Sequence, residues 1–365
     1  MQMILSQYVC LITPVIFLIP LLTYFVLNIT DVAEATSAFY LICITGMGLT
    51  TYSEFWIKRT SALSIIYRIQ QIVDNSVEKF KPFYMQNEVL AYKIVYSFRI
   101  FVFCSVFGVV SLPLCILIIL WVTGNYTDDM RILPAALQLP IDVEQWPGYL
   151  VGYGLCYLAA YFVSLTSGLY VFFISVSLYI KAALDEIRFK LKTINQNHPK
   201  SDIRLQPNGN CEIQQQLIGI VKAHLSVLDL LRELDFFLIR IKYYIFSFGA
   251  ATLCTGLFQL QQSALNGNQM LFQLFAACSC DILVLFMFCL GGEIIIDAYD
   301  VSNSVYQLNW YQFDSNSKYM VWFMIGHSQK PYYFASFKSI NCSLETFTEI
   351  IRKAGAVLAM LQSMK

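Results

Sequence analysis

Long stretches with almost no charge restrict what this chain can fold into. A run of about 20 mostly apolar residues is long enough for a helix to cross the hydrocarbon core of a bilayer. Such runs cover residues 5–27, 37–56, 97–122, 149–179, 243–265 and 271–296. A further apolar stretch ends the chain. We therefore predict an all-α, polytopic membrane protein with seven transmembrane helices.

The composition supports this class and excludes others. Charged residues make up 13% of the 365 residues, whereas a soluble domain has roughly 25%. The formal net charge is zero, which gives no indication of a nucleic-acid partner. We interpret the eleven cysteines, most of them inside apolar runs, as small buried side chains. We find no metal-ligand spacing or phosphate loop, so we expect no cofactor, no metal site and no enzyme.

The basic residues predict how the spans are oriented. Six Lys or Arg residues lie within 58–93, ten within 181–242 and three within 318–338, whereas the opposite loops hold only Arg131. The positive-inside rule then places the N-terminus in the cytoplasm and, with seven spans, the C-terminus outside. This topology is the reverse of that of a G-protein-coupled receptor. Glycosylation sequons at Asn28 and Asn125 fall in the loops placed outside, and membrane lipid surrounds the spans.

The inner loops carry helical patterns that divide the chain into five parts. Within 213–244, apolar residues recur at helical spacing with charges between them, so this segment runs into the fifth span and needs a packing partner. We predict a helical cytoplasmic layer; the alternative is a helix lying on the inner leaflet. The parts are spans one to four (1–180), a cytoplasmic helical segment (181–242), spans five and six (243–296), a second cytoplasmic segment (297–342) and the last helix (343–365).

The last helix begins charged and ends apolar. At 100° per residue its charged, small and polar side chains share one face, and its large apolar residues lie opposite. Such a stripe suits a helix that lines a water-filled path built by several subunits. The alternative is a helix that packs its small face on a neighbour, and the residues alone favour neither. The candidate pore and gate residues are Glu345, Glu349, Arg352, Ala356, Ala359, Met360 and Ser363.

The C-terminal 40 residues resemble a known signature. The segment GHSQKPYYFASFKSINCSLETFTEIIRKAGAVLAMLQSMK (326–365) is similar to the end of the insect odorant receptors, and its His-Ser-Gln-Lys-Pro run (327–331) is the most specific part. The Asn-Trp-Tyr run at 309–311 also fits that family. Seven spans, the reversed topology and a long second inner loop extend the resemblance over nearly the whole chain.

The resemblance implies more than the residues do. Members of this family are ligand-gated, non-selective cation channels in which an odorant-binding subunit and a shared co-receptor form a heterotetramer. Inner helices form an intersubunit anchor domain, and the last helix of each subunit lines a central pore. The chain lacks the co-receptor's very long second inner loop, so it resembles a tuning subunit. Such subunits lie in the plasma membrane of olfactory neuron dendrites and bind a small volatile ligand.

This sequence departs from the family in two places. The resemblance puts the gate near Met360 with Ser363 just outside it, where co-receptors carry Val and Gln, so this chain would contribute asymmetrically to a mixed pore. Family members usually have some tens of residues before the first span, and only a few precede it here. This indicates a short variant or an incomplete gene model.

The resemblance also implies an odorant pocket in the outer half of the bundle, between spans two, three, four and six. An aromatic-rich pocket with few charges suits a small, mostly apolar ligand held by shape. The alternative for each single residue is lipid contact or core packing. The candidates are Phe39, Tyr40, Cys43, Leu114, Ile118, Trp121, Tyr153, Tyr157, Tyr161, Phe272, Phe275 and Ser279.

Three other functions compete with this interpretation. A gustatory receptor of the same superfamily is the nearest, but its last helix typically carries a Thr-Tyr pair and ends in Gln-Phe, and this chain has neither. A secondary transporter needs ionisable residues near the membrane midplane, for which Asp281 is the best candidate. Our alternative for Asp281 is a polar contact, either between helices or toward a water-filled vestibule. An enzyme would have only three histidines available.

Overall fold

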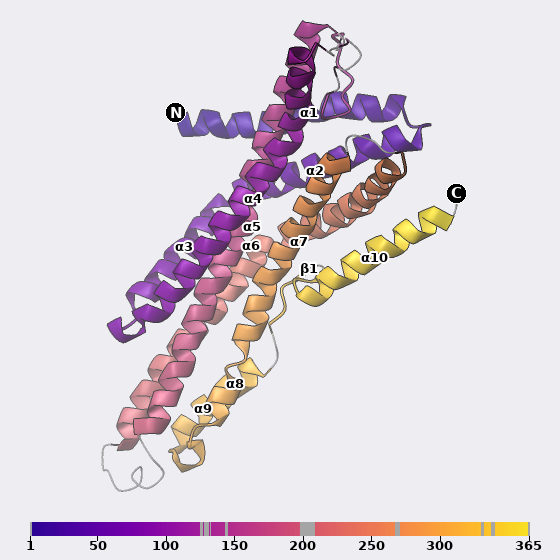
Figure 1. Cartoon of the computed structure of the whole chain (residues 1–365). Helices are drawn as coiled ribbons and strands as arrows, with labels where there is room; N and C mark the ends of the chain where they lie inside the picture. Colours follow the sequence, from indigo (N-terminus) through magenta and orange to yellow (C-terminus); the bar gives the residue numbers. More distant parts are fainter. Residues whose placement is uncertain are drawn as a thin grey trace.

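Helices make up almost the whole chain in a computed structural model (Figure 1). The structure describes residues 2–124, 127, 131, 133–142, 145–197, 209–266, 271–329, 332–336 and 340–363. The helices are α1 (Gln2–Leu27), α2 (Val32–Ile57), α3 (Arg59–Asp74), η1 (Glu78–Phe80), α4 (Lys81–Val122), α5 (Trp146–Asn197), α6 (Gly209–Asn266), α7 (Leu271–Tyr299), α8 (Ser302–Tyr306), η3 (Trp310–Gln312), α9 (Ser315–Ser328) and α10 (Leu344–Ser363). Between α9 and α10, β1 (Ala335–Ser336) pairs antiparallel with β2 (Ile340–Asn341).

Local chemistry explains where several helices begin. Asp31 caps α2, because its carboxylate accepts hydrogen bonds from the backbone N–H groups of Ala33 and Glu34. Asp314 caps α9 in the same way through Ser317. Pro82 lies in the first turn of α4. Its missing N–H has no cost there, because the N–H groups of a first turn have no partner within the helix. The helices then continue far beyond a membrane thickness, to 42 residues in α4, 52 in α5 and 58 in α6.

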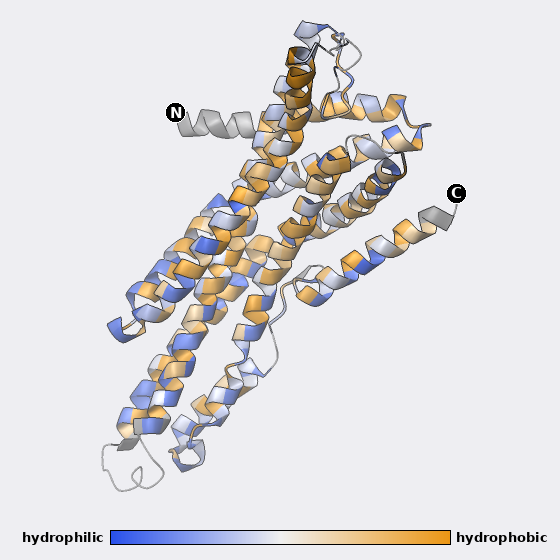
Figure 2. Cartoon of the chain, in the orientation of Figure 1, coloured by the Kyte–Doolittle hydropathy of each residue, from blue (hydrophilic) through white to orange (hydrophobic). Residues whose placement is uncertain are grey.

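Among the described residues, five helices are long and apolar enough to cross a membrane: α2, α4, α5, α6 and α7. The described part of α1 adds a shorter apolar helix, Leu11–Leu27. The α10 helix falls short of the same hydropathy because its first half is charged. Figure 2 shows hydrophobic residues concentrated where these helices approach the α1–α2 and α6–α7 connections, and hydrophilic residues increasing toward α3, α9 and the far ends of α5 and α6.

The extensions of α5 and α6 pack into a continuous core beyond the apolar half. The sequence pattern predicts an apolar stripe on α6, and the structure buries most of it, including Leu217, Ile220 and Leu231. Leu225, which also belongs to that stripe, is 38% exposed. Opposite them α5 buries Leu184 and Leu191 in the same cluster. Burial of both faces makes this a packed layer of helices, whereas a helix lying alone on a bilayer would leave its stripe uncovered by protein.

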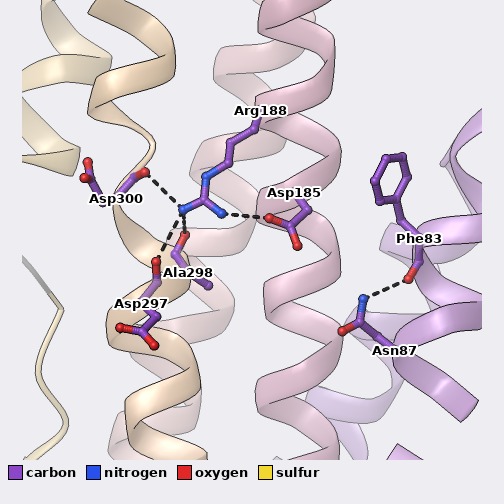
Figure 3. A network of polar contacts seen from close by, with 7 residues as sticks. All are labelled: Phe83, Asn87, Asp185, Arg188, Asp297, Ala298 and Asp300. Atoms are coloured by element: carbon purple, nitrogen blue, oxygen red, sulfur yellow. Dashed lines mark hydrogen bonds and ion pairs between the residues drawn. The ribbon is translucent and has the colours of Figure 1, made fainter. Parts of the chain in front are cut away.

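An arginine fastens the end of α7 to this layer. The Arg188 guanidinium on α5 donates to the backbone carbonyls of Ala298 (2.7 Å) and Asp300 (3.0 Å) and pairs with Asp185 at 2.7 Å (Figure 3). Carbonyls at a helix C-terminus have no partner within the helix, and a cation there is also favoured by the helix dipole. Arg188 thus fixes where α7 stops and α8 begins. Figure 3 also shows a separate contact on α4, where the Asn87 side chain donates to the Phe83 carbonyl one turn earlier.

Candidate ligand cavity and the last helix

A cavity of about 390 Å³ lies among five helices in the apolar half of the bundle. Side chains from α2, α4, α5, α6 and α7 line it, with Phe17 of α1 and the segment at Pro134–Ala135 completing the wall. The lining is mostly apolar, as in Val106, Val109 and Ala277. Its volume lies at the small end of the range of about 300–1,000 Å³ for ligand sites. The cavity therefore suits a small, largely apolar molecule.

A hydrogen bond between α2 and α7 forms part of the cavity wall. The Tyr40 hydroxyl donates to Oδ2 of Asp281 over 2.7 Å, and both residues line the cavity. Tyr40 is 3% exposed, and its ring lies 3.0 Å from where a side chain at Gly256 of α6 would begin. Glycine at that position lets α6 approach the tyrosine closely. Asp281 is therefore held by a polar contact between helices, as one of the two sequence interpretations predicts.

Further polar groups line the cavity away from Asp281. The amides of Gln259 on α6 and Gln273 on α7 belong to side chains that are 8% and 7% exposed. The Ser105 hydroxyl of α4 donates to the Ala276 carbonyl of α7 at 3.1 Å. At the edge, the Glu34 carboxylate accepts a 2.7 Å hydrogen bond from the Tyr24 hydroxyl. These groups place hydrogen-bonding capacity at several points of an otherwise apolar wall.

Tyr40 is the one residue among the twelve pocket candidates that the structure places on the described cavity wall. Tyr153 is buried in the cluster between α1 and α5, next to Tyr149 and Tyr157. Tyr157 shares a 3.0 Å hydrogen bond with Ser111. Cys43 is buried, Leu114 packs on the α1–α5 cluster and Ser279 bonds to the Phe275 carbonyl. The remaining candidates expose large apolar surface: Phe39, Ile118, Trp121, Tyr161, Phe272 and Phe275.

The cavity residues that the sequence interpretation passed over are the glutamines and serines within apolar spans. Gln273 and Ser105 interrupt runs that are otherwise apolar, whereas Gln259 lies in the more polar end of the fifth span, with Gln261, Gln262 and Ser263 close behind it. A polar side chain at that depth must face protein or water, because lipid cannot satisfy it. That rule would have selected them, whereas the aromatic residues selected instead are common on lipid-facing surfaces.

The α10 helix leaves the bundle and extends away from it (Figure 1). Its first half packs through one face: Ala354 is 2% exposed, and Phe347 stacks edge-on against Phe286 of α7 at 5.5 Å. The opposite face is exposed in the single chain. Within it Glu349 pairs with Lys353 at 3.4 Å and more loosely with Arg352. Six of the seven pore candidates are exposed: Glu345, Glu349, Arg352, Ala356, Ala359 and Met360. The side chain of Ser363 lies outside the described residues.

The two sequons predicted to lie outside fall in different positions. Asn28 lies in the turn between α1 and α2, where its side chain donates to the Tyr24 carbonyl at 3.0 Å. Asn125 lies outside the described residues. The use of either asparagine for glycosylation stays a prediction.

Comparison with known proteins identifies the family. Residues 31–355 match the family model described as "7tm Odorant receptor". The chain belongs to this odorant receptor family. Over 198 residues, or 53% of its length, this receptor is 24% identical to Odorant receptor 22c of Drosophila melanogaster. The match covers 48% of that relative, so it spans about half the relative's length.

Solved structures with the same fold cover nearly the whole receptor. The insect olfactory receptor OR5 from Machilis hrabei, in complex with eugenol, superposes with a TM-score of 0.81 at 12% identity. A second structure of the same protein gives 0.80 at 11% identity, and both cover 98% of this chain and 88% of theirs. The predicted all-α, seven-transmembrane fold is therefore confirmed. The receptor is a multi-pass membrane protein.

Proposed function

We propose that this receptor is the odorant-binding subunit of a heteromeric, ligand-gated, non-selective cation channel. In this account it assembles with the odorant co-receptor into a heterotetramer in the dendritic plasma membrane of olfactory neurons. Family membership and the OR5 fold support a receptor for small volatile molecules. The moderate length of the second inner loop, residues 180–242, supports a tuning subunit.

The observation that carries the proposal is that α7 contacts both candidate sites. Asp281 on α7 lines the cavity, and Glu293 on the same helix accepts a 2.9 Å hydrogen bond from the Leu344 N–H at the start of α10. Twelve residues separate the two carboxylates, or about 18 Å along a helix. A ligand that moves α7 at the cavity would therefore displace the first turn of α10. The ligand need only bind the open state more tightly than the closed one.

The shape of α10 supports a pore made by several copies of this fold. One helix cannot enclose a path for ions, and its exposed face carries charges first and small residues afterwards. If the basic loops are cytoplasmic, the charged start of the face lies inside and Met360 lies near the outer surface. The packed layer of α3, α9 and the α5 and α6 extensions is then the cytoplasmic anchor between subunits.

Recording from oocytes tests the proposal. We expect volatile compounds to evoke cation current when this receptor and an insect odorant co-receptor are expressed together, and no current from this receptor alone. The matched control is the co-receptor alone with the same compounds, which separates responses of the pair from those of the partner. Current from this receptor alone would contradict the heteromeric proposal. Absence of ligand-evoked current, with the complex at the cell surface and ligand binding demonstrated, would contradict the channel.

A further inference from the structure

We propose that the cavity binds a small volatile alcohol or phenol, whose hydroxyl group donates a hydrogen bond to the Asp281 carboxylate. The inference rests on the proposed function, because it assigns a ligand class to the same cavity. It follows from the balance of hydrogen-bond donors and acceptors on the cavity wall.

The described wall offers strong acceptors and no cation. Two carboxylates line it, Asp281 and Glu34, and none of its described lining residues is Lys, Arg or His. Three hydroxyl donors of the wall are already engaged within the protein: Tyr40 donates to Asp281, and Ser105 and Thr36 donate to backbone carbonyls. The wall also carries the hydroxyls of Ser37, Thr45 and Ser263. A carboxylate has about four lone-pair positions for hydrogen bonds. Asp281 therefore retains acceptor capacity after its bond to Tyr40.

A hydrogen-bond donor on the ligand would stabilise the Asp281 carboxylate. A carboxylate far from bulk water is costly unless it is paired or hydrogen-bonded. Within the described part of the chain Asp281 has no ion-pair partner, and it accepts a hydrogen bond from Tyr40 of α2. A ligand hydroxyl would add a second, charge-assisted hydrogen bond in a site of low polarity. A hydrocarbon or an ether of the same shape cannot do so.

The glutamines favour a hydroxyl over a group that only donates. Among the described residues, neither the Gln259 nor the Gln273 amide has a hydrogen-bond partner, although both side chains are more than nine-tenths buried on the cavity wall. Each amide can donate as well as accept. Gln273 precedes Asp281 by eight residues, or about 12 Å along α7. The cavity thus combines a buried carboxylate acceptor on α7 with amides on α6 and α7 and an otherwise mostly apolar wall, which suits an alcohol or phenol with a compact apolar body.

The test compares each alcohol or phenol with its methyl ether. The ether keeps the carbon skeleton and the oxygen acceptor but loses the donor. In oocytes expressing the receptor with the co-receptor, we expect the alcohol to act at a concentration about tenfold or more below that of the ether, because a hydrogen bond to a charged group is lost. Asp281→Asn should reduce this ratio severalfold. The matched control, Asp229→Asn at an exposed ion pair on the α6 extension, should leave the ratio unchanged.

A second variant keeps the proposal falsifiable if Asp281→Asn fails to reach the surface. Tyr40→Phe removes the internal donor and leaves the Asp281 acceptor in place, so the preference for the alcohol should persist or increase. Loss of that preference in Tyr40→Phe would overturn the assignment. An ether as potent as its alcohol in the unaltered receptor would overturn it as well.

A binding measurement separates failure of the ligand class from failure of the channel proposal. The purified receptor in detergent should be stabilised against heat by the alcohol more than by the ether. Stabilisation by the alcohol without evoked current supports the ligand class and contradicts the channel. Equal currents from alcohol and ether support the channel and overturn the ligand class. No stabilisation and no current from any alcohol or phenol in the series also overturns the ligand class.

Discussion

The carboxylate of Glu293 on α7 accepts a 2.9 Å hydrogen bond from the backbone N–H of Leu344, the first residue of α10. Free N–H groups at a helix N-terminus need acceptors, and a negative charge there is favoured by the helix dipole. A second free N–H group in this first turn, that of Thr346, donates a 3.3 Å hydrogen bond to the Ser343 hydroxyl. The start of α10 is therefore anchored to α7, although the rest of the helix extends away from the bundle.

Replacing Glu293 with alanine should weaken the link between α7 and α10. A hydrogen bond to a charged group contributes about 1.5–3 kcal/mol, so we expect a lower maximal current at saturating ligand with ligand binding retained. Recording from the pair with the co-receptor, normalised to surface abundance, checks this. Glu212→Ala, on the exposed first turn of α6, is the control. Unchanged current in Glu293→Ala would show that this bond has no part in opening.

The close contact between Gly292 and Cys342 predicts a strong steric effect. A Cβ atom at Gly292 would lie 2.0 Å from the Cys342 carbonyl oxygen, a backbone atom that cannot move aside alone. Gly292→Ala should therefore separate α7 from the strand before α10 and cost about 1–3 kcal/mol of stability or more. The melting temperature of the purified receptor measures this. Gly219→Ala in α6 meets no atom within 4 Å and should be neutral or stabilising; similar losses in both variants would contradict the steric explanation.

Arg188 should be irreplaceable by lysine. Its planar guanidinium reaches Asp185 together with the carbonyls of Asp297, Ala298 and Asp300, at and just beyond the end of α7, and a lysine ammonium lacks that fork. We expect Arg188→Lys to lower stability by about 1–3 kcal/mol, seen as a lower melting temperature. Arg232→Lys, at an exposed ion pair, is the control and should change little. An unchanged melting temperature in Arg188→Lys would mean that packing alone fixes the end of α7.

Acid should destabilise the packed layer through His224. Burial, and secondarily the charge of His327, lowers the pKa of His224 to about 4, and neither of its ring nitrogens has a hydrogen-bond partner among the described residues. The residue lies on α6 outside the predicted span at 243–265. An unfolded histidine has a pKa near 6.5, so between about pH 4 and 6.5 the unfolded chain binds a proton that the folded chain does not. This contribution to stability is complete above pH 6.5 and is lost as the pH falls to about 4.

Melting curves between pH 4 and 7 check this expectation. His224→Leu should show a smaller fall of melting temperature with acid than the unaltered receptor. At the acid end, the acid-induced loss of unfolding free energy should differ between the two proteins by at most about 3 kcal/mol. The control is His327→Gln at the exposed neighbour of His224. It removes the neighbouring charge but keeps the buried His224 ring, so its melting temperature should still fall with acid. Parallel pH curves for His224→Leu and the unaltered receptor would contradict the assignment.

The sequence predicts the helices of this receptor far better than the residues of its cavity. Apolar runs locate α2, α4, α5, α6 and α7 because span length and side-chain hydropathy are local properties. The stripe containing Leu217 and Leu231 likewise predicts that α6 continues as a packed helix. Which face of a span meets the cavity depends on how five helices rotate against one another. Trp121 and Phe272 are therefore exposed where pocket residues were predicted.

Asp281 and the β1–β2 pair are two further features whose partners could not be predicted from the sequence. A lone acidic residue in an apolar span predicts a polar contact, but its partner, Tyr40, is 241 residues away in sequence. The strand pair consists of two residues on each side, too short for any periodic pattern. Next to the pair, the Cys342 N–H donates to the Phe334 carbonyl at 3.0 Å, a contact between residues eight apart in sequence.

The central claim is that ligand in the cavity opens a path lined by α10, and cysteine accessibility at Met360 tests it most directly. Met360 is 58% exposed on the face that carries Glu349 and Ala356. In the Met360→Cys receptor paired with the co-receptor, a small cationic thiol reagent applied from outside should change the evoked current, and faster with ligand than without. The unaltered pair controls for native cysteines. Complete labelling of Cys at this position with no change in current would contradict the claim.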